Sequence, residues 1–424
     1  MVQRIGRRAL GAGVGSLLAS GAWAQGKRLD VLGHRVMQSV LTGGAAGDQT
    51  GAWRAQSGAE LAWTTLDIDP LGDRLLRELS LPETGFGVSF LLNGRASPQV
   101  AGLLEPLGPW QEREPVLNWA DMAPGLVDAM TVGGQLVGVP FRHATNGLFY
   151  NEALLEARGI TAPPRTLEEF VDQARRVGGR GADGTPVAGL VMTAALAAFP
   201  IMFARAYGGD FITADYKLLP EPQAMQRALA LLRSLFEAGV LPRSYALISN
   251  DDQVTWMQQG RAAFAILPFA RSAQLNREDQ SRFPGRIKAV EFPASTDIPA
   301  GAKMAAVVEF WSMAVPRNAR DKALGWSFIR AMSDPAVTLG AARNGNGPVR
   351  VSTYADPAFA AAQPVAAVEA RALAAARIPY PAFAEGNRAA GIMVEEVQAA
   401  VLGRKPVEQA VADIASRVRP LLPA

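Results

Sequence analysis

The sequence predicts an α/β protein with room for two domain-sized cores, and three observations support this prediction. Short strand-like apolar runs alternate with amphipathic helices along the chain, which is the pattern of α/β architecture. The chain has 424 residues, and about 400 remain after a predicted export signal, enough for two cores of about 100–200 residues each. It contains no cysteine, which excludes a disulfide scaffold, a thiol nucleophile and a cysteine-ligated zinc site.

Residues 1–24 have the layout of a secretory signal peptide. Three arginines, Arg4, Arg7 and Arg8, precede the uncharged, weakly apolar stretch 9–22, and cleavage is expected after Ala24. The stretch is shorter than the roughly 20 apolar residues of a membrane-spanning helix. We therefore expect export to the periplasm by the Sec route, with twin-arginine export as the alternative because two of the arginines are adjacent. Without a cysteine, no lipid anchor is expected on the mature N-terminus.

The formal charge of the mature chain argues against a nucleic-acid partner. The whole chain carries +3, and removal of the three arginines of the export signal brings this to zero. No basic stripe with interleaved aromatic residues remains to bind a phosphate backbone. The most apolar internal stretch, 304–316, is interrupted by Glu309 and is too short to cross a bilayer.

The first third of the chain predicts three strands and a helix. Residues 28–33, 87–92 and 135–141 are strand-like, and residues 69–81 carry leucines at helical spacing. Pro140 predicts that the chain leaves regular pairing near the end of the third strand, because proline has no backbone N–H to donate.

The clearest local signals come after residue 147. A compact apolar strand, 148–150, precedes Asn151, which is placed to cap a helix over 152–158, and a capping box opens another helix at Thr166. Downstream, the pattern predicts helices over 222–238, 251–259, 318–333, 385–402 and 406–418, and strands over 262–267, 287–292 and 307–315.

The residues that catalysis needs are scarce. Only two histidines occur, His34 and His143, and neither belongs to a metal-ligand spacing. No nucleophile elbow, phosphate-binding loop or dinucleotide fingerprint is present. Adjacent glutamates at 168–169 and 395–396 lie on predicted helix faces, where a solvated surface is the ordinary role. The sequence therefore predicts no enzyme, no cofactor and no metal site, and a secreted carboxylate-dependent hydrolase stays open as an alternative.

The segment 147–160, followed by 163–170, resembles the extracellular solute-binding proteins of ABC importers, in the group of maltose- and other sugar-binding proteins. That group has a Tyr-Asn, a short helix, Gly-Ile, a Pro-Pro turn and a Thr-initiated capping box in this order. Similar but weaker matches cover most of the mature chain, at 102–107, 260–266, 314–318 and 347–350.

The chain departs from the pattern of this group at two positions. Gly85-Phe86-Gly87-Val88 stands where the group has Pro-Asp-Val, which puts an acidic contact from that strand in doubt. Glu309-Phe310-Trp311 replaces a glycine pair often found before a late strand, which alters the lining of the cleft.

The resemblance implies a two-lobed periplasmic binding protein fold of type II, with the solute between lobes that are joined by crossing hinge segments. The expected lobes are 25–142 plus 292–344 and 143–291 plus 345–424, with crossings near 142–145, 290–293 and 344–348. The implied function is the substrate-binding component of an ABC importer, a monomer that delivers a sugar or sugar-like solute to the membrane permease by hinge closure. An anionic or polyamine-type solute and a sensory role stay open.

Ligand contacts are expected at strand ends and at the crossings, because solutes favour interdomain clefts and the loops that follow strands. Alternation along the strand at 307–315 puts Phe310 on one face and its two neighbours on the other. Aromatic planes with planar hydrogen-bonding groups suit sugars. The candidate ligand-binding residues are His34, Arg35, Asn93, Arg95, Arg142, His143, Thr145, Asn146, Phe269, Arg271, Glu309, Phe310, Trp311 and Tyr380.

Overall fold

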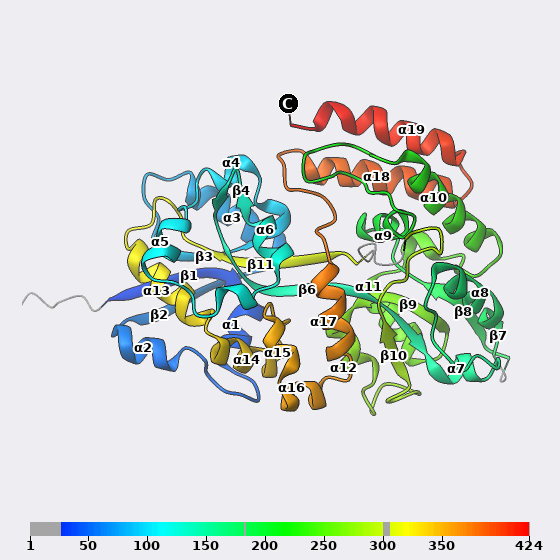
Figure 1. Cartoon of the computed structure of the whole chain (residues 1–424), viewed down its shortest axis with the longest axis horizontal. Helices are drawn as coiled ribbons and strands as arrows, with labels where there is room; N and C mark the ends of the chain where they lie inside the picture. The colour runs from blue at the N-terminus through cyan, green and yellow to red at the C-terminus, as the bar shows by residue number, and fades with distance from the viewer. Residues whose placement is uncertain (1–26, 182–183, 300–305, 424) are drawn as a thin grey trace, which may run out of the picture.

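The computed structural model describes residues 27–181, 184–299 and 306–423, and the predicted signal peptide lies outside them. It shows an elongated α/β molecule with two lobes, joined in the middle by strands (Figure 1). One nine-stranded sheet runs through the whole molecule in the order β2-β1-β3-β11-β6-β9-β8-β7, and β10 pairs with β6 off this path. Within the described residues, no helix has the length and apolar character needed to cross a membrane.

The first lobe is built on a parallel strand trio. Strand β1 pairs in parallel with both β2 and β3, and β11 adds to β3 in the antiparallel direction. Its strands are β1 (Arg28–His34), β2 (Glu60–Leu66) and β3 (Phe86–Leu92), with the small hairpin β4 (Thr131–Val132) and β5 (Gln135–Leu136). Its helices are α1 (Arg35–Thr42), α2 (Gly51–Ser57), α3 (Ile68–Leu79), α4 (Pro98–Ala101), α5 (Gly108–Arg113), α6 (Pro124–Ala129), α13 (Lys322–Met332) and α14 (Pro335–Arg343).

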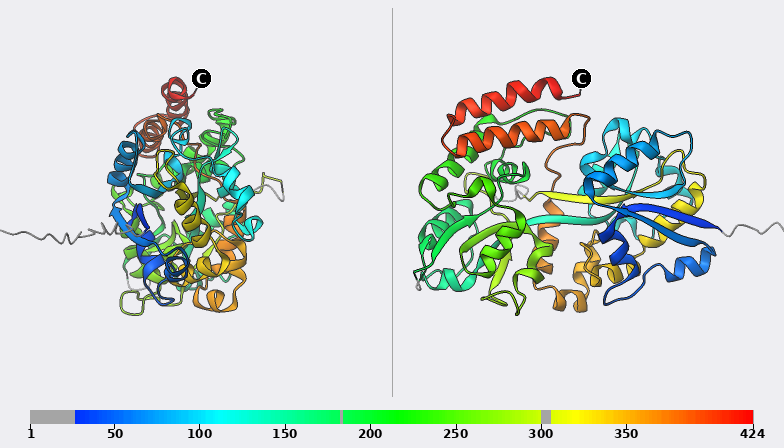
Figure 2. Two further views of the ribbon diagram at one scale, coloured as in Figure 1. Left: turned by 90° about the vertical axis from the view of Figure 1, so that its left-hand side faces the viewer. Right: turned by 180° about the vertical axis from the view of Figure 1, so that it is seen from behind.

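The second lobe continues the same sheet and carries the C-terminal helices on its outside (Figure 2, right). Its strands are β7 (Gly179–Arg180), β8 (Pro186–Val191), β9 (Ala262–Pro268) and β10 (Ile287–Val290). Its helices are α7 (Glu152–Glu156), α8 (Leu167–Val177), α9 (Ala198–Ala206), α10 (Pro222–Glu237), α11 (Asn250–Gln258), α12 (Ser272–Leu275), α18 (Gly386–Val401) and α19 (Val407–Val418).

Two long strands connect the lobes. Strand β6 (Val139–Asn151) leads from the first lobe into the second, and β11 (Val308–Ala314) leads back, antiparallel to β6. The chain crosses again after α17 (Ala366–Ala375), on its way to α18 (Figure 1). Helices α15 (Val351–Ala355) and α16 (Pro357–Ala362) pack against each other and against α14, and α17 packs on β6.

The continuity of β6 corrects one prediction. We expected separate strands over 135–141 and 148–150, with a break at Pro140, but the strand runs unbroken from Val139 to Asn151. The bulge lies in β6 itself: Trp311 pairs with Arg142 and Ser312 pairs with Pro140, which leaves Phe141 as the extra residue of a β-bulge next to the proline. A proline is tolerated at such a bulge because the missing N–H has no ladder partner to lose.

The helix predicted over 318–333 begins later than expected. The structure starts α13 at Lys322, where the Asp321 carboxylate accepts the N–H of Leu324 at 2.8 Å. Asn318 instead donates its amide to the carbonyl oxygens of Glu78 and Leu81. The sequence analysis did not anticipate β2 or the helices α1, α2, α9 and α14–α17, several of which are short or apolar on all sides and lack a clear helical stripe.

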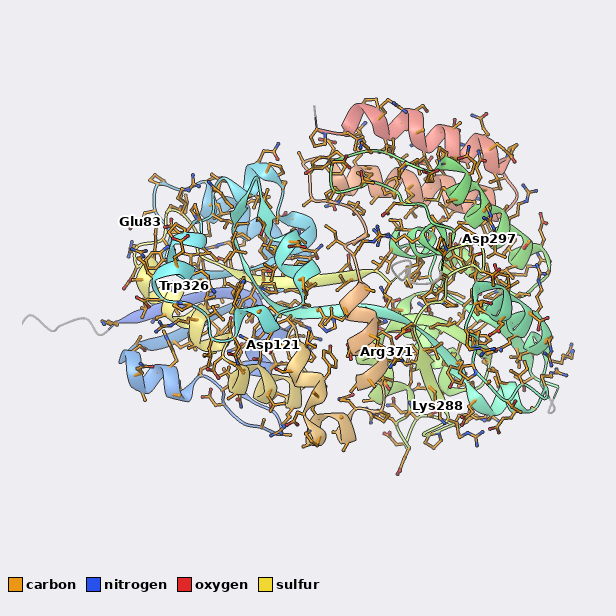
Figure 3. All side chains as sticks on the ribbon, in the orientation of Figure 1. Glu83, Asp121, Lys288, Asp297, Trp326 and Arg371 are labelled. Carbon is orange, nitrogen blue, oxygen red and sulfur yellow. The ribbon has the colours of Figure 1, made fainter. Side chains whose placement is uncertain are left out.

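Each lobe has its own aromatic centre. In the second lobe, the rings of Phe170, Phe203 and Phe292 pack edge-to-face. In the first lobe, Trp53 packs edge-on against Phe328 at 5.1 Å between centroids. Figure 3 shows the side chains of both lobes and labels Trp326, which is buried within the first. Edge-to-face pairs stabilise by about 0.5–1.5 kcal/mol beyond the area they bury.

A buried arginine fixes the segment that follows α17. The Arg205 side chain is 2% exposed and pairs with Asp210 at 3.1 Å. It also donates to the carbonyl oxygens of residues 377, 378 and 379, at 3.2, 2.7 and 3.3 Å. Burial lowers its pKa to about 10, against the opposing charge of Asp210, so the guanidinium stays protonated at neutral pH. The position of Tyr380, the next residue, therefore depends on this contact.

Substitution of Arg205→Met should destabilise the protein by about 3–5 kcal/mol, because it leaves a buried carboxylate and three carbonyl groups short of a donor. Urea unfolding of the purified protein measures the change. Arg233→Met is the matched control, since Arg233 pairs with Glu237 on the surface of α10 and such pairs contribute about 0–1 kcal/mol. Equal losses in the two variants would contradict the role given to Arg205.

Candidate functional site

The pairing of β6 with β11 decides which side chains face the space between the lobes. Glu309 lies opposite Ala144, Phe310 opposite His143, and Trp311 opposite Arg142. Residues directly opposite in an antiparallel pair point to the same side, and successive residues point to opposite sides. The predicted alternation around Phe310 is confirmed.

The two faces of this strand pair differ in exposure. On one face, Glu309 is exposed, and Arg142, Ala144 and Trp311 are half-buried. We call these four residues the open face. On the other face, His143, Thr145, Phe310 and Val308 are at most 1% exposed. Helix α17 packs on β6, and in Figure 2, right, the crossing strands are drawn in front of it.

Glu309 is the acidic group of the open face. Its carboxylate is reached by solvent, yet burial raises its pKa. The two facts together describe a recessed group, surrounded by protein but not covered by it. Within residues 27–181, 184–299 and 306–423, it makes no hydrogen bond or ion pair.

Tyr380 lies close to Glu309. Burial, and then the charge of Glu309, raise the pKa of the Tyr380 phenol to about 12, so the hydroxyl keeps its proton at neutral pH. The ring packs edge-on against Phe211 at 6.0 Å between centroids. The half-buried hydroxyl is therefore a donor or acceptor that the fold holds in place next to a carboxylate.

His34 and Arg35 come to the open face from the first lobe. His34 Nδ1 accepts the N–H of Val36 at 3.2 Å and so caps α1. Its ring centroid is 6.2 Å from that of Trp311. Burial lowers the pKa of His34, with the nearby charge of Asp67 opposing and those of Arg35 and Arg142 assisting, so the ring is neutral at neutral pH. Arg35 is exposed and pairs with Asp67.

The Arg142 guanidinium is tied to the protein rather than free. Its Nη1 donates to the carbonyl oxygen of Gly345 and to Oδ1 of Asn346, both at 3.1 Å. The Asn346 amide in turn donates to the carbonyl oxygen of Phe141 at 2.9 Å. These bonds fasten the segment after α14 along the crossing strand, and they use part of the donor capacity of the arginine.

Behind the strands lies a buried polar cluster centred on His143. Its Nε2 lies 2.7 Å from the Tyr354 hydroxyl, and its Nδ1 lies 3.0 Å from the Thr145 hydroxyl. The Glu369 carboxylate of α17 lies 3.8 Å from Nε2. Burial, with help from the charge of Arg142, lowers the pKa of His143 to about 3. Burial raises the pKa of Glu369 to about 8, against the charge of Arg142. At neutral pH this cluster is therefore mostly uncharged.

Several candidate residues lie away from the open face. Asn93 is buried, and its Oδ1 accepts the N–H of Phe310 at 2.9 Å, so it joins β11 to the end of β3. Phe269 is 1% exposed, and its ring occupies the place that a side chain at position 147 would need. Asn146 is also buried, where β6 enters the second lobe. Arg271 pairs with Asp251 at 3.1 Å on the surface of the second lobe.

Arg95 lines a separate hollow of about 340 Å³. Its guanidinium lies against the backbone at Gly72 of α3, and the lining also includes Phe383, which precedes α18, and Asn387 in the first turn of α18. Both lobes therefore contribute to this hollow.

The sequence analysis missed Ala144, Asp67, Tyr354 and Glu369. Ala144 has no side-chain chemistry to detect, and its place on the open face follows only from the strand register. Glu369 lies in a run of alanines on α17, where an isolated glutamate looks like an ordinary surface residue. Its burial depends on contacts with residues more than two hundred positions away in the chain.

A family model described as bacterial extracellular solute-binding protein matches residues 91–338, more than half of the chain. The chain belongs to this family. A probable ABC transporter-binding protein of Deinococcus radiodurans is 26% identical over 212 residues, which are 47% of this chain and 49% of that protein. The match thus spans about half the length of this curated relative.

Solved structures agree with the two-lobed fold over nearly the whole chain. The sugar-binding protein MalE of Xanthomonas citri superposes with a TM-score of 0.78 at 20% identity, covering 93% of this chain and 97% of that one. The maltose-bound MalE3 of T. maritima gives 0.75 at 22%, covering 93% and 100%. A ribitol-bound solute-binding protein of Agrobacterium radiobacter K84 gives 0.74 at 18%, covering 93% and 99%. The predicted family and fold class are confirmed.

The raised pKa of Glu369 makes the stability of the protein depend on pH. A carboxyl group with a pKa near 8 in the folded state, and near its ordinary 4.5 when unfolded, binds more protons folded than unfolded between these values. Stability therefore falls as the pH rises from about 4.5 to about 8, by at most about 1.4 kcal/mol per pH unit from this group.

Glu369→Gln should flatten the dependence of the unfolding free energy on pH over this range, measured by urea unfolding at several pH values. Glu83→Gln, at an exposed site, is the control, and an unchanged slope in Glu369→Gln would refute the assignment.

Proposed function

We propose that this chain is the periplasmic substrate-binding component of an ABC importer, and that it carries a sugar or sugar-like small solute to the permease. The observation that carries the proposal is the open face. A carboxylate, a guanidinium and an indole project from two antiparallel strands that connect the lobes. Solutes bind preferentially in clefts at domain interfaces.

The chemistry of the open face supports a sugar-like solute. The Trp311 ring offers an apolar plane for the C–H face of a sugar, and Glu309 and Tyr380 offer acceptors and a donor for hydroxyl groups. Two solved structures of similar fold hold maltose and ribitol. The proposed contacts are His34, Arg35, Arg142, Glu309, Trp311 and Tyr380, and Ala144 leaves room above the strands.

The transport role has further consequences. We propose a cleavable export signal over residues 1–24, two lobes with the boundaries expected from the sequence, and closure by bending of the crossing segments. The partners are the small solute and the permease subunits of the importer. The protein acts as a monomer and releases its solute unchanged, without catalysis.

Ligand binding should raise the melting temperature of protein stripped of bound solute, since a ligand that binds only the folded state stabilises it by mass action. The measurement is a thermal-shift screen of saccharides, polyols, organic acids and polyamines. A shift with saccharides or polyols is expected. If no solute in the four classes shifts the transition, the proposed function is wrong.

Trp311→Ala should weaken binding of the best solute by at least about tenfold, because stacking aromatic residues are frequent binding hot spots. Isothermal titration calorimetry measures the affinity. Trp256→Ala is the matched control, since Trp256 is also half-buried but lies on α11 in the second lobe, against Arg261. Equal affinities for Trp311→Ala and the unchanged protein would exclude this strand face as the binding surface.

A further inference from the structure

Glu309 has no direct partner among the charged groups around the open face in the described part of the chain. Among the described residues, Arg35 is neutralised by Asp67, and His34 is neutral at neutral pH. Arg142 is bound to the carbonyl oxygen of Gly345 and to Asn346. Glu309 is left as a carboxylate without a hydrogen bond or ion pair in the described part of the chain.

The position of Glu309 shows why its lack of a direct partner matters for ligand binding. It projects from the start of β11, a strand that connects the lobes, two residues from Trp311 and on the same side of the sheet. Tyr380 lies close enough for the Glu309 charge to act on its phenol. The carboxylate thus lies in a recess near two aromatic rings, those of Trp311 and Tyr380. Such surroundings are typical of a ligand contact rather than of a solvated surface charge.

Closure of the lobes over a solute would remove water from this carboxylate. A desolvated carboxylate is strongly unfavourable unless hydrogen-bond donors or a cation replace the water. The Tyr380 hydroxyl is one donor that the described residues place near Glu309. A carboxylate can accept more hydrogen bonds than one hydroxyl donates, so the solute can supply the others. A second anion at this position would add like-charge repulsion to the loss of water.

We propose that Glu309 is the specificity-determining residue of the open face: it accepts hydrogen bonds from adjacent hydroxyl groups or a protonated amine of the solute, and it excludes solutes that place a carboxylate or phosphate there. This inference rests on the proposed function and narrows it. The substrate class is a neutral polyhydroxyl solute or an amino sugar, and sugar acids and sugar phosphates bound at this position are excluded.

The test uses the exported chain without its signal, stripped of bound solute, and titration calorimetry with maltose, ribitol, glucose, glucosamine and glucuronate. The last three share one pyranose ring: glucosamine has an amine in place of the 2-hydroxyl of glucose, and glucuronate has a carboxylate in place of its 6-hydroxymethyl group. We expect binding by at least one hydroxyl- or amine-bearing member, and binding of glucuronate at least about tenfold weaker than that of glucose or glucosamine. Preference for glucosamine over glucose identifies an amine as the donor, and the reverse identifies hydroxyls.

Glu309→Gln should lower the affinity for the best solute by about tenfold or more, since a charge-assisted hydrogen bond is lost while the shape of the side chain is kept. The ligand-free melting temperature of this variant should equal or exceed that of the unchanged protein, because an unpaired recessed charge has been removed. A merely structural glutamate would instead lose stability on substitution. Glu309→Asp, which keeps the charge but withdraws it by one methylene, should also weaken binding and serves if the glutamine variant does not fold.

Glu83→Gln is the matched control and should bind as the unchanged protein does. Figure 3 labels Glu83 at the outer edge of the first lobe, and its carboxylate pairs with Arg320 at 2.5 Å. Tightest binding of glucuronate, or full affinity in Glu309→Gln, would overturn the inference while the proposed function stands. No binding of any of the five solutes, together with no response in the thermal-shift screen of the four solute classes, would overturn both.

Discussion

The antiparallel pairing of β6 with β11 is the constraint on which the rest of this structure depends. These strands connect the two lobes, and their register fixes which side chains meet the space between them. A shift by one residue would turn every side chain to the opposite face. Glu309 would then be buried with the polar cluster, and Phe310 would be exposed between the lobes. The β-bulge at Phe141, next to Pro140 in β6, lets the pairing continue into the first lobe.

The buried face of these strands explains why the crossing region can hold polar groups at all. His143, Thr145 and Tyr354 satisfy one another by hydrogen bonds, and Glu369 lies beside them in a mostly protonated form. A neutral, hydrogen-bonded cluster avoids the cost of burying charge. Helix α17 is further held by Arg371, labelled between the lobes in Figure 3, which pairs with Glu291 at 2.5 Å. The crossing strands therefore have one fixed face and one face that is free to meet a solute.

Much of the fold followed from local signals in the sequence. The caps at Asn151 and Thr166 gave correct helix starts, because such signals depend on nearest neighbours alone. The predicted capping box at Thr166 forms only in half, because the Glu169 carboxylate accepts the N–H of Arg165 rather than that of Thr166. The strand continuity through Pro140 and the start of α13 at Lys322 did not follow, because a partner strand and a distant pair of carbonyl groups decide them. Local propensity gives way to tertiary contacts at such positions.

The site was predictable in outline but not residue by residue. Strand ends and crossings are where the sequence led us to expect ligand contacts, and the structure brings Glu309, Trp311, Arg142 and His34 together there. Asn93 and Phe269 have the same sequence signals but are buried, Asn93 against the backbone of β11 and Phe269 against Gly147. The difference lies in side-chain direction, which depends on strand register and on glycines such as Gly147 that admit a ring against the backbone. Neither the strand register nor the packing of a ring against a distant glycine can be predicted from a single segment of the sequence.

The most direct test of this account is a crystal structure of the protein with its preferred solute. The account predicts a solute seated on the open face, within hydrogen-bonding distance of Glu309 and in contact with the Trp311 ring, with His143 still buried behind β6. A solute bound on the His143 side of the strands, or in the hollow beside Arg95 with Glu309 left facing water, would contradict it.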